Sequence, residues 1–283
     1  MESILTTNPD PRLTSRLLAC GRPAAPLLLC IHGGGCNGGY FDMRGFSVAR
    51  AAMVHGFDVL LVNRPGYGGS APPRTANSID EAADLLPDHL LPIMATRASP
   101  DLVVIGHSIG GAVTLILAAE ARIPIRAIAV SGIGRVPGEA LCAWLGQRGF
   151  ADPNVGSQPP AELFFGPEGS YDWRGPMALR QVVEPWRPDE LRDVRVDWPA
   201  RFDAIVSAIR VPVSFHLAEY ERIWRAGPQD VADAASRFTR ALRIEAGVLP
   251  EGGHLYEIHK RGVELAAKQM RFLADAVVTA TCR

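Results

Sequence analysis

Short apolar runs alternate with longer amphipathic segments along most of this chain. Runs that are apolar at consecutive positions are typical of strands buried on both faces, and the amphipathic segments between them are typical of crossover helices. The pattern therefore predicts an α/β fold with a mostly parallel central sheet flanked by helices. The expected strands are 26–33, 57–66, 101–108, 125–132, 211–219 and 241–248, and the expected helices are 43–55, 79–96, 109–122 and about 257–278.

The interval 135–210 breaks this alternation, since it carries nine prolines and four of the five tryptophans without a clear strand. A loop of that length without secondary structure is uncommon in a compact domain, so the interval should hold several short helices. We expect a core formed by residues 1–134 and 211–283, with a cap, or lid, inserted at 135–210.

Charge and cysteine usage exclude several classes of protein. The net charge is −1 and no basic block is long enough to follow a phosphate backbone, which argues against nucleic acid as a partner. The first residues lack a secretory signal and no apolar run is long enough to span a membrane, which predicts a cytoplasmic protein. An odd number of cysteines without a CxxC pair predicts reduced thiols, at Cys20, Cys30, Cys36, Cys142 and Cys282.

Ser108 lies in the segment "DLVVIGHSIGGAVTLIL", residues 101–117, where Gly106, Ser108 and Gly110 fit the pattern G-x-S-x-G. The pattern is short enough to occur by chance. Here, however, an apolar strand leads into it and an apolar helix follows, which is the setting of a nucleophilic serine on a sharp turn. The alternative is a serine that only shapes the turn or caps the helix.

A serine needs a base within hydrogen-bond reach, and the base needs an orienting acid. Of the seven histidines, His254 follows the last predicted strand on the glycine-marked loop "VLPEGGHLYE" and would reach the same sheet edge as Ser108. His259 is its local rival, which we expect to face solvent from the following helix. The remaining histidines lie on other predicted elements: His32, His55, His89, His107 and His216.

The glycine-rich stretch "HGGGCNGGY" follows the first of these predicted strands. A backbone N–H without a neighbouring side chain can approach a developing oxyanion closely. Phosphate binding is the alternative for a glycine loop after a strand, and the chain lacks the G-K-[ST] sequence of a phosphate-binding loop.

Four motifs together resemble the α/β-hydrolase superfamily, in particular its serine esterases and lipases with a cap: "LCIHGGG", "VNRPGYGGS", "IGHSIGG" and "EGGHLYEIH". The resemblance implies a cap inserted after the sixth strand, with Ser108 as nucleophile and His254 as base. It also implies that the amides of Gly34 and Ile109 form the oxyanion hole. No metal and no organic cofactor is implied. "NRPGYGGS" has Asn63 where aspartate is commoner, in a turn that is structural in this family.

The acid departs from the family pattern. In "VPVSFHLAEYE", residues 211–221, Glu221 stands at the usual aspartate position and Ala218 replaces a common glycine. A glutamate can orient a histidine as an aspartate does. Glu219 and Asp230 remain the alternatives.

The resemblance implies a carboxylic esterase that acts on a small or medium substrate with an apolar portion. Thioester hydrolysis, acyl transfer and C–C bond hydrolysis use the same three side chains, and a binding protein that has lost turnover is the alternative outside enzymes. Arg174, Arg187 and Arg192 could meet a carboxylate or solvate the surface. Aromatic residues of the interval 135–210 could line the ligand site or pack a core of the cap: Trp144, Phe150, Phe164, Phe165, Tyr171, Trp173, Trp186, Trp198 and Phe202.

Overall fold

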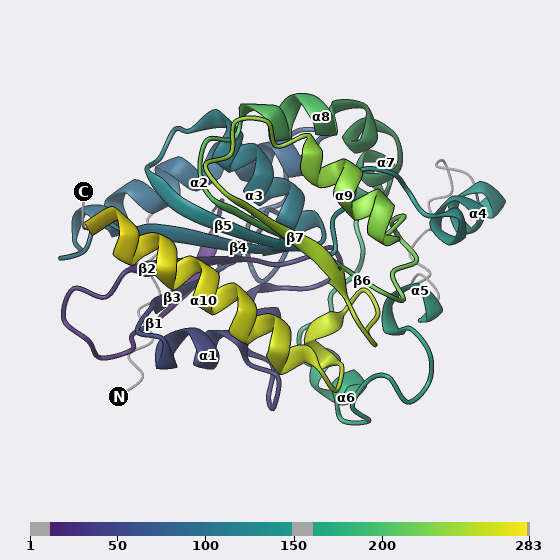
Figure 1. Ribbon diagram of the computed structural model, residues 1–283, viewed down its shortest axis with the longest axis horizontal. Coiled ribbons are helices and arrows are strands. Elements are labelled where there is room, and N and C mark those ends of the chain that lie inside the picture. The colour runs from purple at the N-terminus through teal and green to yellow at the C-terminus, as the bar shows by residue number, and fades with distance from the viewer. Residues whose placement is uncertain (1–11, 149–160, 282–283) are drawn as a thin grey trace.

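The computed structural model describes residues 12–148 and 161–281. Seven strands of these residues form one sheet in the order β1-β3-β2-β4-β5-β6-β7 (Figure 1). β1 is antiparallel to β3, and every other neighbouring pair is parallel. The strands are Thr14–Leu18 (β1), Leu27–Ile31 (β2), Asp58–Asn63 (β3), Leu102–His107 (β4), Ile125–Ser131 (β5), Val213–Ala218 (β6) and Ile244–Leu249 (β7).

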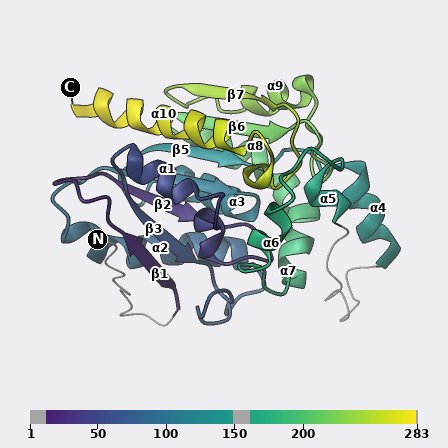
Figure 2. The same cartoon turned by 90° about the horizontal axis from the view of Figure 1, so that it is seen from below.

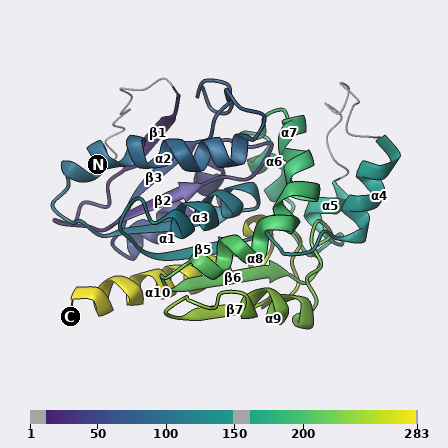
Figure 3. The same ribbon diagram turned by 90° about the horizontal axis from the view of Figure 1, so that it is seen from above.

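Helices cover both faces of the sheet, which confirms the predicted α/β class (Figures 2 and 3). β2 shows why both faces must be covered. Leu27, Leu29 and Ile31 pack into one apolar cluster while Leu28 and Cys30 pack into another, because successive side chains of a strand point to opposite faces. The first cluster includes side chains of α2 (Ser78–Ala95), α3 (Ile109–Glu120) and α8 (Trp198–Ala208), and the second includes those of α1 (Val48–Val54) and α10 (Gly262–Thr281).

Several short helices precede α8 between β5 and β6, as predicted for the proline- and tryptophan-rich interval. They are α4 (Glu139–Arg148), α5 (Glu162–Phe165), α6 (Gly175–Leu179), α7 (Pro188–Arg192) and the π-helix η2 (Asp193–Asp197). We call residues 139–148 and 161–197 the helical insertion. In the described residues it follows the fifth strand and not the sixth. Phe150 lies outside the described residues, and the division of the chain into core and cap stays a prediction.

α8 packs directly on the core of the fold. Its Phe202 and Val206 belong to the apolar cluster that includes α3, and the Phe202 ring lies 6.4 Å from that of Phe215 in β6. α8 therefore covers the sheet together with α2 and α3, although it falls inside the predicted interval 135–210.

Several elements differ from the predictions, and one of them is α9 (Pro228–Ser236), a helix that was not predicted between β6 and β7. β1 was not predicted, because a five-residue edge strand containing serine and arginine lacks an apolar run. The predicted helix 43–55 begins only at residue 48, since the Ser47 side chain accepts the Arg50 N–H and caps it, and the 3-10 helix η1 (Gly38–Asp42) precedes it. The last helix, α10, begins at residue 262 after the 3-10 helix η3 (Tyr256–Ile258).

The carboxyl ends of four parallel strands gather the predicted site residues. Gly34 follows β2, Ser108 follows β4, Glu221 follows β6 and His254 follows β7. This is the edge at which ligands bind in open α/β sheets.

Candidate active site

Ser108 occupies a strained turn between β4 and α3. Its backbone has φ 52° and ψ −122°, which a residue with a Cβ atom rarely adopts. The neighbouring glycines permit the turn: a Cβ on Gly110 would lie 1.9 Å from the carbonyl oxygen of Ile31, and a Cβ on Gly106 would lie 2.3 Å from that of Gly110. The Ser108 N–H donates to the carbonyl of Ser131 at 2.8 Å, which ties the turn to β5.

Three side chains form a continuous hydrogen-bonded chain. The Ser108 Oγ lies 2.9 Å from His254 Nε2, and His254 Nδ1 lies 2.8 Å from Glu221 Oε2. The other carboxylate oxygen, Glu221 Oε1, accepts the N–H of Ile223 at 2.9 Å. The side chains of His254 and Glu221 are almost fully buried. Because the carboxylate can only accept, Nδ1 carries the proton and Nε2 is free to accept the serine proton.

The two alternative acids lie elsewhere. Glu219 is exposed and accepts the N–H of Glu251 at 2.8 Å. Asp230 accepts the N–H of Gly227 at the start of α9 (Pro228–Ser236). Neither side chain is hydrogen-bonded to His254.

His259 does not face solvent as predicted. It is 3% exposed, because it follows the short η3 and not a full helix turn, and its Nε2 accepts the N–H of Gly253 at 3.0 Å. This bond supports the backbone directly before His254. Burial lowers the pKa of His259 to about 4, so the ring stays neutral at pH 7.

His107, directly before Ser108, is buried, and its Nδ1 lies 3.2 Å from the Ser131 hydroxyl. Its ring stacks on that of Tyr40 with centroids 5.0 Å apart, and the Tyr40 hydroxyl donates to the buried carboxylate of Glu257. Burial lowers the pKa of His107 to about 4. His89 lies on α2 and His216 lies within β6, as predicted, whereas His55 was predicted on a helix and follows the end of α1.

Backbone amides approach Ser108 from two segments. As the first residue of α3, Ile109 has an N–H without an intrahelical acceptor. The glycine loop lies against the serine, since a Cβ on Gly33 would be 3.1 Å from that of Ser108 and a Cβ on Gly34 would be 2.8 Å from Ile109 Cδ1. The glycine loop therefore lies next to Ser108 and to the side chain of Ile109, and the assignment of the Gly34 and Ile109 amides as oxyanion donors stays a prediction.

Gly33, Gly35 and Gly38 also match the spacing G-x-G-x-x-G of dinucleotide-binding loops. In such loops a long helix follows and its N-terminus holds the pyrophosphate. Here the five-residue 3-10 helix η1 follows instead, which argues against phosphate binding.

Two cavities meet at the aromatic pair Phe164 and Trp186, whose rings lie 5.7 Å apart. The inner cavity touches Ser108 and measures only about 20 Å³, roughly the space of one water. The outer groove measures about 370 Å³, which is within the range of ligand pockets. Its walls are mainly apolar and include Gly34, Gly35, Phe165, Met177 and Val183.

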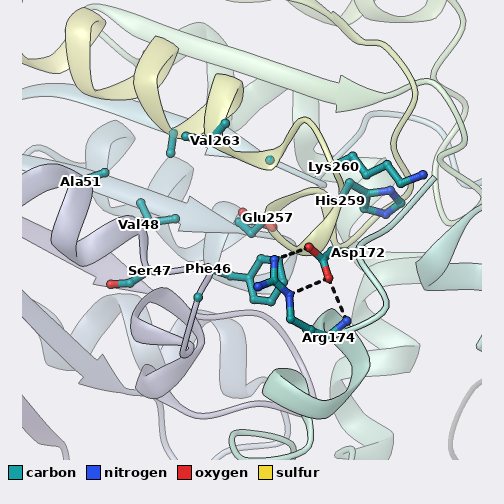
Figure 4. A pocket seen from close by; sticks show the side chains of 13 residues that line it. Phe46, Ser47, Val48, Ala51, Asp172, Arg174, Glu257, His259, Lys260 and Val263 are labelled. Carbon is teal, nitrogen blue, oxygen red and sulfur yellow. Dashed lines mark hydrogen bonds and ion pairs between the residues drawn. The ribbon is translucent and has the colours of Figure 1, made fainter. Parts of the chain in front are cut away.

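A third cavity of about 240 Å³ lies apart from Ser108, beside α1 and the start of α10 (Figure 4). Arg174 and Asp172 form an ion pair at its wall, with 2.7 Å between Nη2 and Oδ2. Arg187 likewise pairs with Asp189 at 3.2 Å. Two of the arginines considered for binding a carboxylate therefore already have acidic partners.

Four of the five cysteines, Cys20, Cys30, Cys36 and Cys142, are free thiols, as predicted, while Cys282 lies outside the described residues. Burial raises the pKa of Cys36 to about 12. No helix within residues 12–148 and 161–281 is long and apolar enough to cross a membrane. In the same part of the chain, no group of three or more His, Cys, Asp or Glu side chains could hold a metal ion.

Sequence reasoning missed the side chains that surround the triad. Phe164 lies edge-on to His254 with centroids 5.6 Å apart, and Trp186 covers the glycine loop, where a Cβ on Gly34 would be 2.4 Å from Cζ3 of the indole. Both belong to the aromatic set noted in the sequence, but only the fold selects them from that set.

Solved structures with this fold include several hydrolases. A monoacylglycerol lipase of Paleococcus ferrophilus shares 18% sequence identity over 93% of this chain and 99% of its own, with a TM-score of 0.69. A thermophilic esterase of Thermogutta terrifontis shares 16% identity over 96% and 97%, also with a TM-score of 0.69. A lipase-esterase related protein of Clostridium acetobutylicum shares 16% over 92% and 99%, with a TM-score of 0.68. At these identities the likeness concerns the fold.

A search of curated proteins finds no match to the sequence. The model of the alpha/beta hydrolase family matches residues 28–268, which include the glycine loop, the serine turn and the His254 loop. Most of the chain is therefore described by one family model, and the protein belongs to the alpha/beta hydrolase family.

Proposed function

We propose that the protein is a serine hydrolase that cleaves a carboxylic ester through an acyl-enzyme. The observation that carries the proposal is the buried hydrogen-bonded chain from Ser108 through His254 to Glu221. A lipase and an esterase among the structures of similar fold support the same reaction class.

In the proposed reaction, Ser108 Oγ attacks the ester carbonyl carbon while His254 Nε2 takes its proton. The carbonyl oxygen becomes an oxyanion, which the amides of Gly34 and Ile109 stabilise, and each such donor contributes roughly 3 kcal/mol. His254 then gives the proton to the departing alkoxide, and the alcohol leaves. Water attacks the acyl-enzyme by the same route and releases the acid.

Glu221 keeps the proton of His254 on Nδ1 and stabilises the imidazolium that forms. The Ile223 N–H holds the other carboxylate oxygen, so that the acid enters the reaction already oriented. We therefore assign the role of acid to Glu221.

We also propose that the helical insertion is a lid. The inner cavity is too small for an acyl group, whereas the outer groove has ligand size and apolar walls. Rotation of Phe164 and Trp186 would join the two spaces. The apolar portion of the substrate would then lie in the outer groove with its carbonyl beside Ser108.

Labelling with a fluorophosphonate probe tests the serine chemistry. We expect stoichiometric labelling of the folded protein at Ser108, no labelling of Ser108→Ala and slow labelling of His254→Ala. Equal labelling of the parent and of Ser108→Ala would overturn the assignment of the nucleophile, and absence of labelling in the folded parent would favour a binding protein.

A comparison of substrates tests the reaction class. We expect turnover of p-nitrophenyl esters by the parent and none above background by Ser108→Ala. Turnover of a matched thioester or diketone without turnover of any ester would replace esterase by thioesterase or C–C hydrolase.

A further inference from the structure

A buried ion pair joins the helical insertion to the glycine loop. Arg64 lies directly after β3 and Glu190 lies on α7, and their side chains are 1% and 0% exposed. The Arg64 Nη1 donates to Glu190 Oε1, and the hydroxyl of Tyr67 donates to Glu190 Oε2 at 2.7 Å. Both oxygens of the Glu190 carboxylate therefore accept hydrogen bonds from side chains of the protein.

The other donors of Arg64 hold the glycine loop. Its Nε donates to the carbonyl of His32 and its Nη2 to the carbonyl of Gly33, each at 2.9 Å. The Tyr67 hydroxyl accepts the N–H of Gly35 at 3.2 Å. The two side chains bound to Glu190 therefore fix the backbone on both sides of Gly34.

His32 provides a second donor to the carbonyl of Gly33. Its Nε2 accepts the backbone N–H of Arg64 at 3.1 Å, so its proton lies on Nδ1, which donates to the carbonyl of Gly33 at 2.8 Å. Burial lowers the pKa of His32 well below its ordinary value, which keeps this neutral form at neutral pH.

The Gly33 carbonyl and the Gly34 N–H belong to one planar peptide group, in which they point in opposite directions because the bond is trans. Donors that hold the carbonyl toward Arg64 and His32 therefore aim the Gly34 N–H away from them. The tilt of this peptide plane decides whether the proposed oxyanion donor reaches the reacting oxygen.

From this geometry we propose that Glu190, acting through Arg64 and Tyr67, is a positioning residue for the Gly34 amide. The inference rests on the proposed esterase function. A buried ion pair is weak evidence for stability, because desolvation of the two charges offsets their attraction. The Arg64–Glu190 ion pair lies against the glycine loop, so we assign it a role in positioning that loop. Because Glu190 belongs to the helical insertion, docking of that insertion contributes to the position of the oxyanion donor.

The test compares an ester with its thiono analogue, in which sulfur replaces the carbonyl oxygen. Sulfur is a weak hydrogen-bond acceptor, so the preference for the oxygen ester reports on the oxyanion donors. In Glu190→Gln we expect kcat for the oxygen ester to fall about 10-fold to 100-fold with KM nearly unchanged. The ratio of kcat/KM for the oxygen and thiono esters should fall at least about tenfold.

Asp193→Asn is the matched control. Asp193 is a buried carboxylate three residues further along the insertion and also pairs with an arginine, Arg201, without contact to the glycine loop. Asp193→Asn should leave the ratio of kcat/KM for the oxygen and thiono esters unchanged. Tyr67→Phe removes the hydroxyl between Glu190 and Gly35, and it should lower the ratio even if Glu190→Gln folds poorly.

An unchanged ratio in folded Glu190→Gln or in folded Tyr67→Phe would overturn the proposal, whatever happens to kcat. Equal losses of the ratio in Asp193→Asn would do the same, since they would indicate a general disturbance of the insertion. Failure of the esterase function itself would be recognised separately, because the parent would then turn over no ester and Ser108 would remain unlabelled.

Discussion

The strand ends and the helical insertion contribute to the site in different ways. Ser108, Glu221 and His254 each follow a strand, and backbone hydrogen bonds hold the turn or the carboxylate in place. The insertion contributes aromatic walls, such as Phe164 and Trp186, and one buried carboxylate, Glu190. The proposed reactive groups thus lie just after strands of the sheet, while the shape of the proposed binding space depends on side-chain packing. Substitutions in the two regions should therefore have different signatures.

Glu221→Gln should produce the largest effect. An amide in place of the carboxylate no longer selects the proton on Nδ1 or stabilises the imidazolium, so kcat should fall by about 10³ to 10⁴. Steady-state kinetics with a short p-nitrophenyl ester measure this. Glu219→Gln and Asp230→Asn are the controls and should stay within about threefold of the parent. A loss in either control that exceeds the loss in Glu221→Gln would refute the assignment of the acid.

Acid should destabilise the sheet through its buried histidines. Burial lowers the pKa of His107 to about 4 and that of His216 to about 3. Since both rings take up protons near pH 6.5 only when unfolded, their contribution is complete above pH 6.5 and is lost as the pH falls toward 4. The unfolding free energy should fall by on the order of 3 kcal/mol for each ring.

Urea unfolding at pH 7.0, 5.5 and 4.5 measures this loss. His216→Phe should make the pH dependence shallower by about one proton. His55→Gln, at an exposed position, should leave the slope unchanged. If the unfolding free energy of His216→Phe depended on pH as steeply as that of the parent, the lowered pKa of His216 would be contradicted.

Trp186→Ala tests the insertion. Loss of the indole should join the inner cavity to the outer groove, so that kcat/KM for a long-chain ester rises about tenfold relative to the acetate, or about 1.4 kcal/mol. Trp173→Ala is a suitable control, because Trp173 is 76% exposed and lines neither cavity. An equal change for all chain lengths would show that the indole does not limit the binding space.

The smallest effect should come from Asp193 in the insertion, and its sign is opposite to that of the histidines. Burial raises the pKa of Asp193 to about 6, so the folded state binds a proton that the unfolded state has released. The associated stability is complete below about pH 4 and is lost as the pH rises through 6. Asp193→Asn should therefore raise the unfolding free energy at pH 8 and leave it nearly unchanged at pH 4.

Thermal melts of the parent and of Asp193→Asn at pH 8 and pH 4 measure this difference. Asp203→Asn provides the contrast, since hydrogen bonds from Arg135 lower the pKa of Asp203 and its removal should destabilise the protein at pH 8. Stabilisation by Asp193→Asn at both pH values would mean that burial of the charge is not its cause.

Local patterns predicted the sheet well. β2, β3 and β4 contain runs of consecutive apolar residues, and α2 begins within one residue of its predicted start at 79. β1 escaped prediction because its pairing with β3, which joins Thr14 to Asn63, has no counterpart in local hydrophobicity. Asn63 itself, expected only to shape a turn, accepts the N–H of Gly38 and thereby fixes the end of the glycine loop.

The contacts of the insertion could not be predicted in this way. Glu190 lies in "PDELR", a stretch typical of an exposed helix end, and its complete burial is explained by its contacts with Arg64, 126 positions earlier, and with Tyr67. Trp186 was one of several aromatic residues in the same interval. Which of them covers Gly34 depends on the packing of distant segments, and the sequence pattern carries no signal for it.

The order of the strands along the chain has a consequence for biosynthesis. Ser108 follows the third of the parallel strands, whereas His254 follows β7, close to the end of the described residues. A growing chain that has released β5 carries the serine but has neither Glu221 nor His254. The proposed nucleophile therefore lacks its acid and its base while the strands up to β5 are made, and the proposed triad can assemble only when β7 joins the sheet.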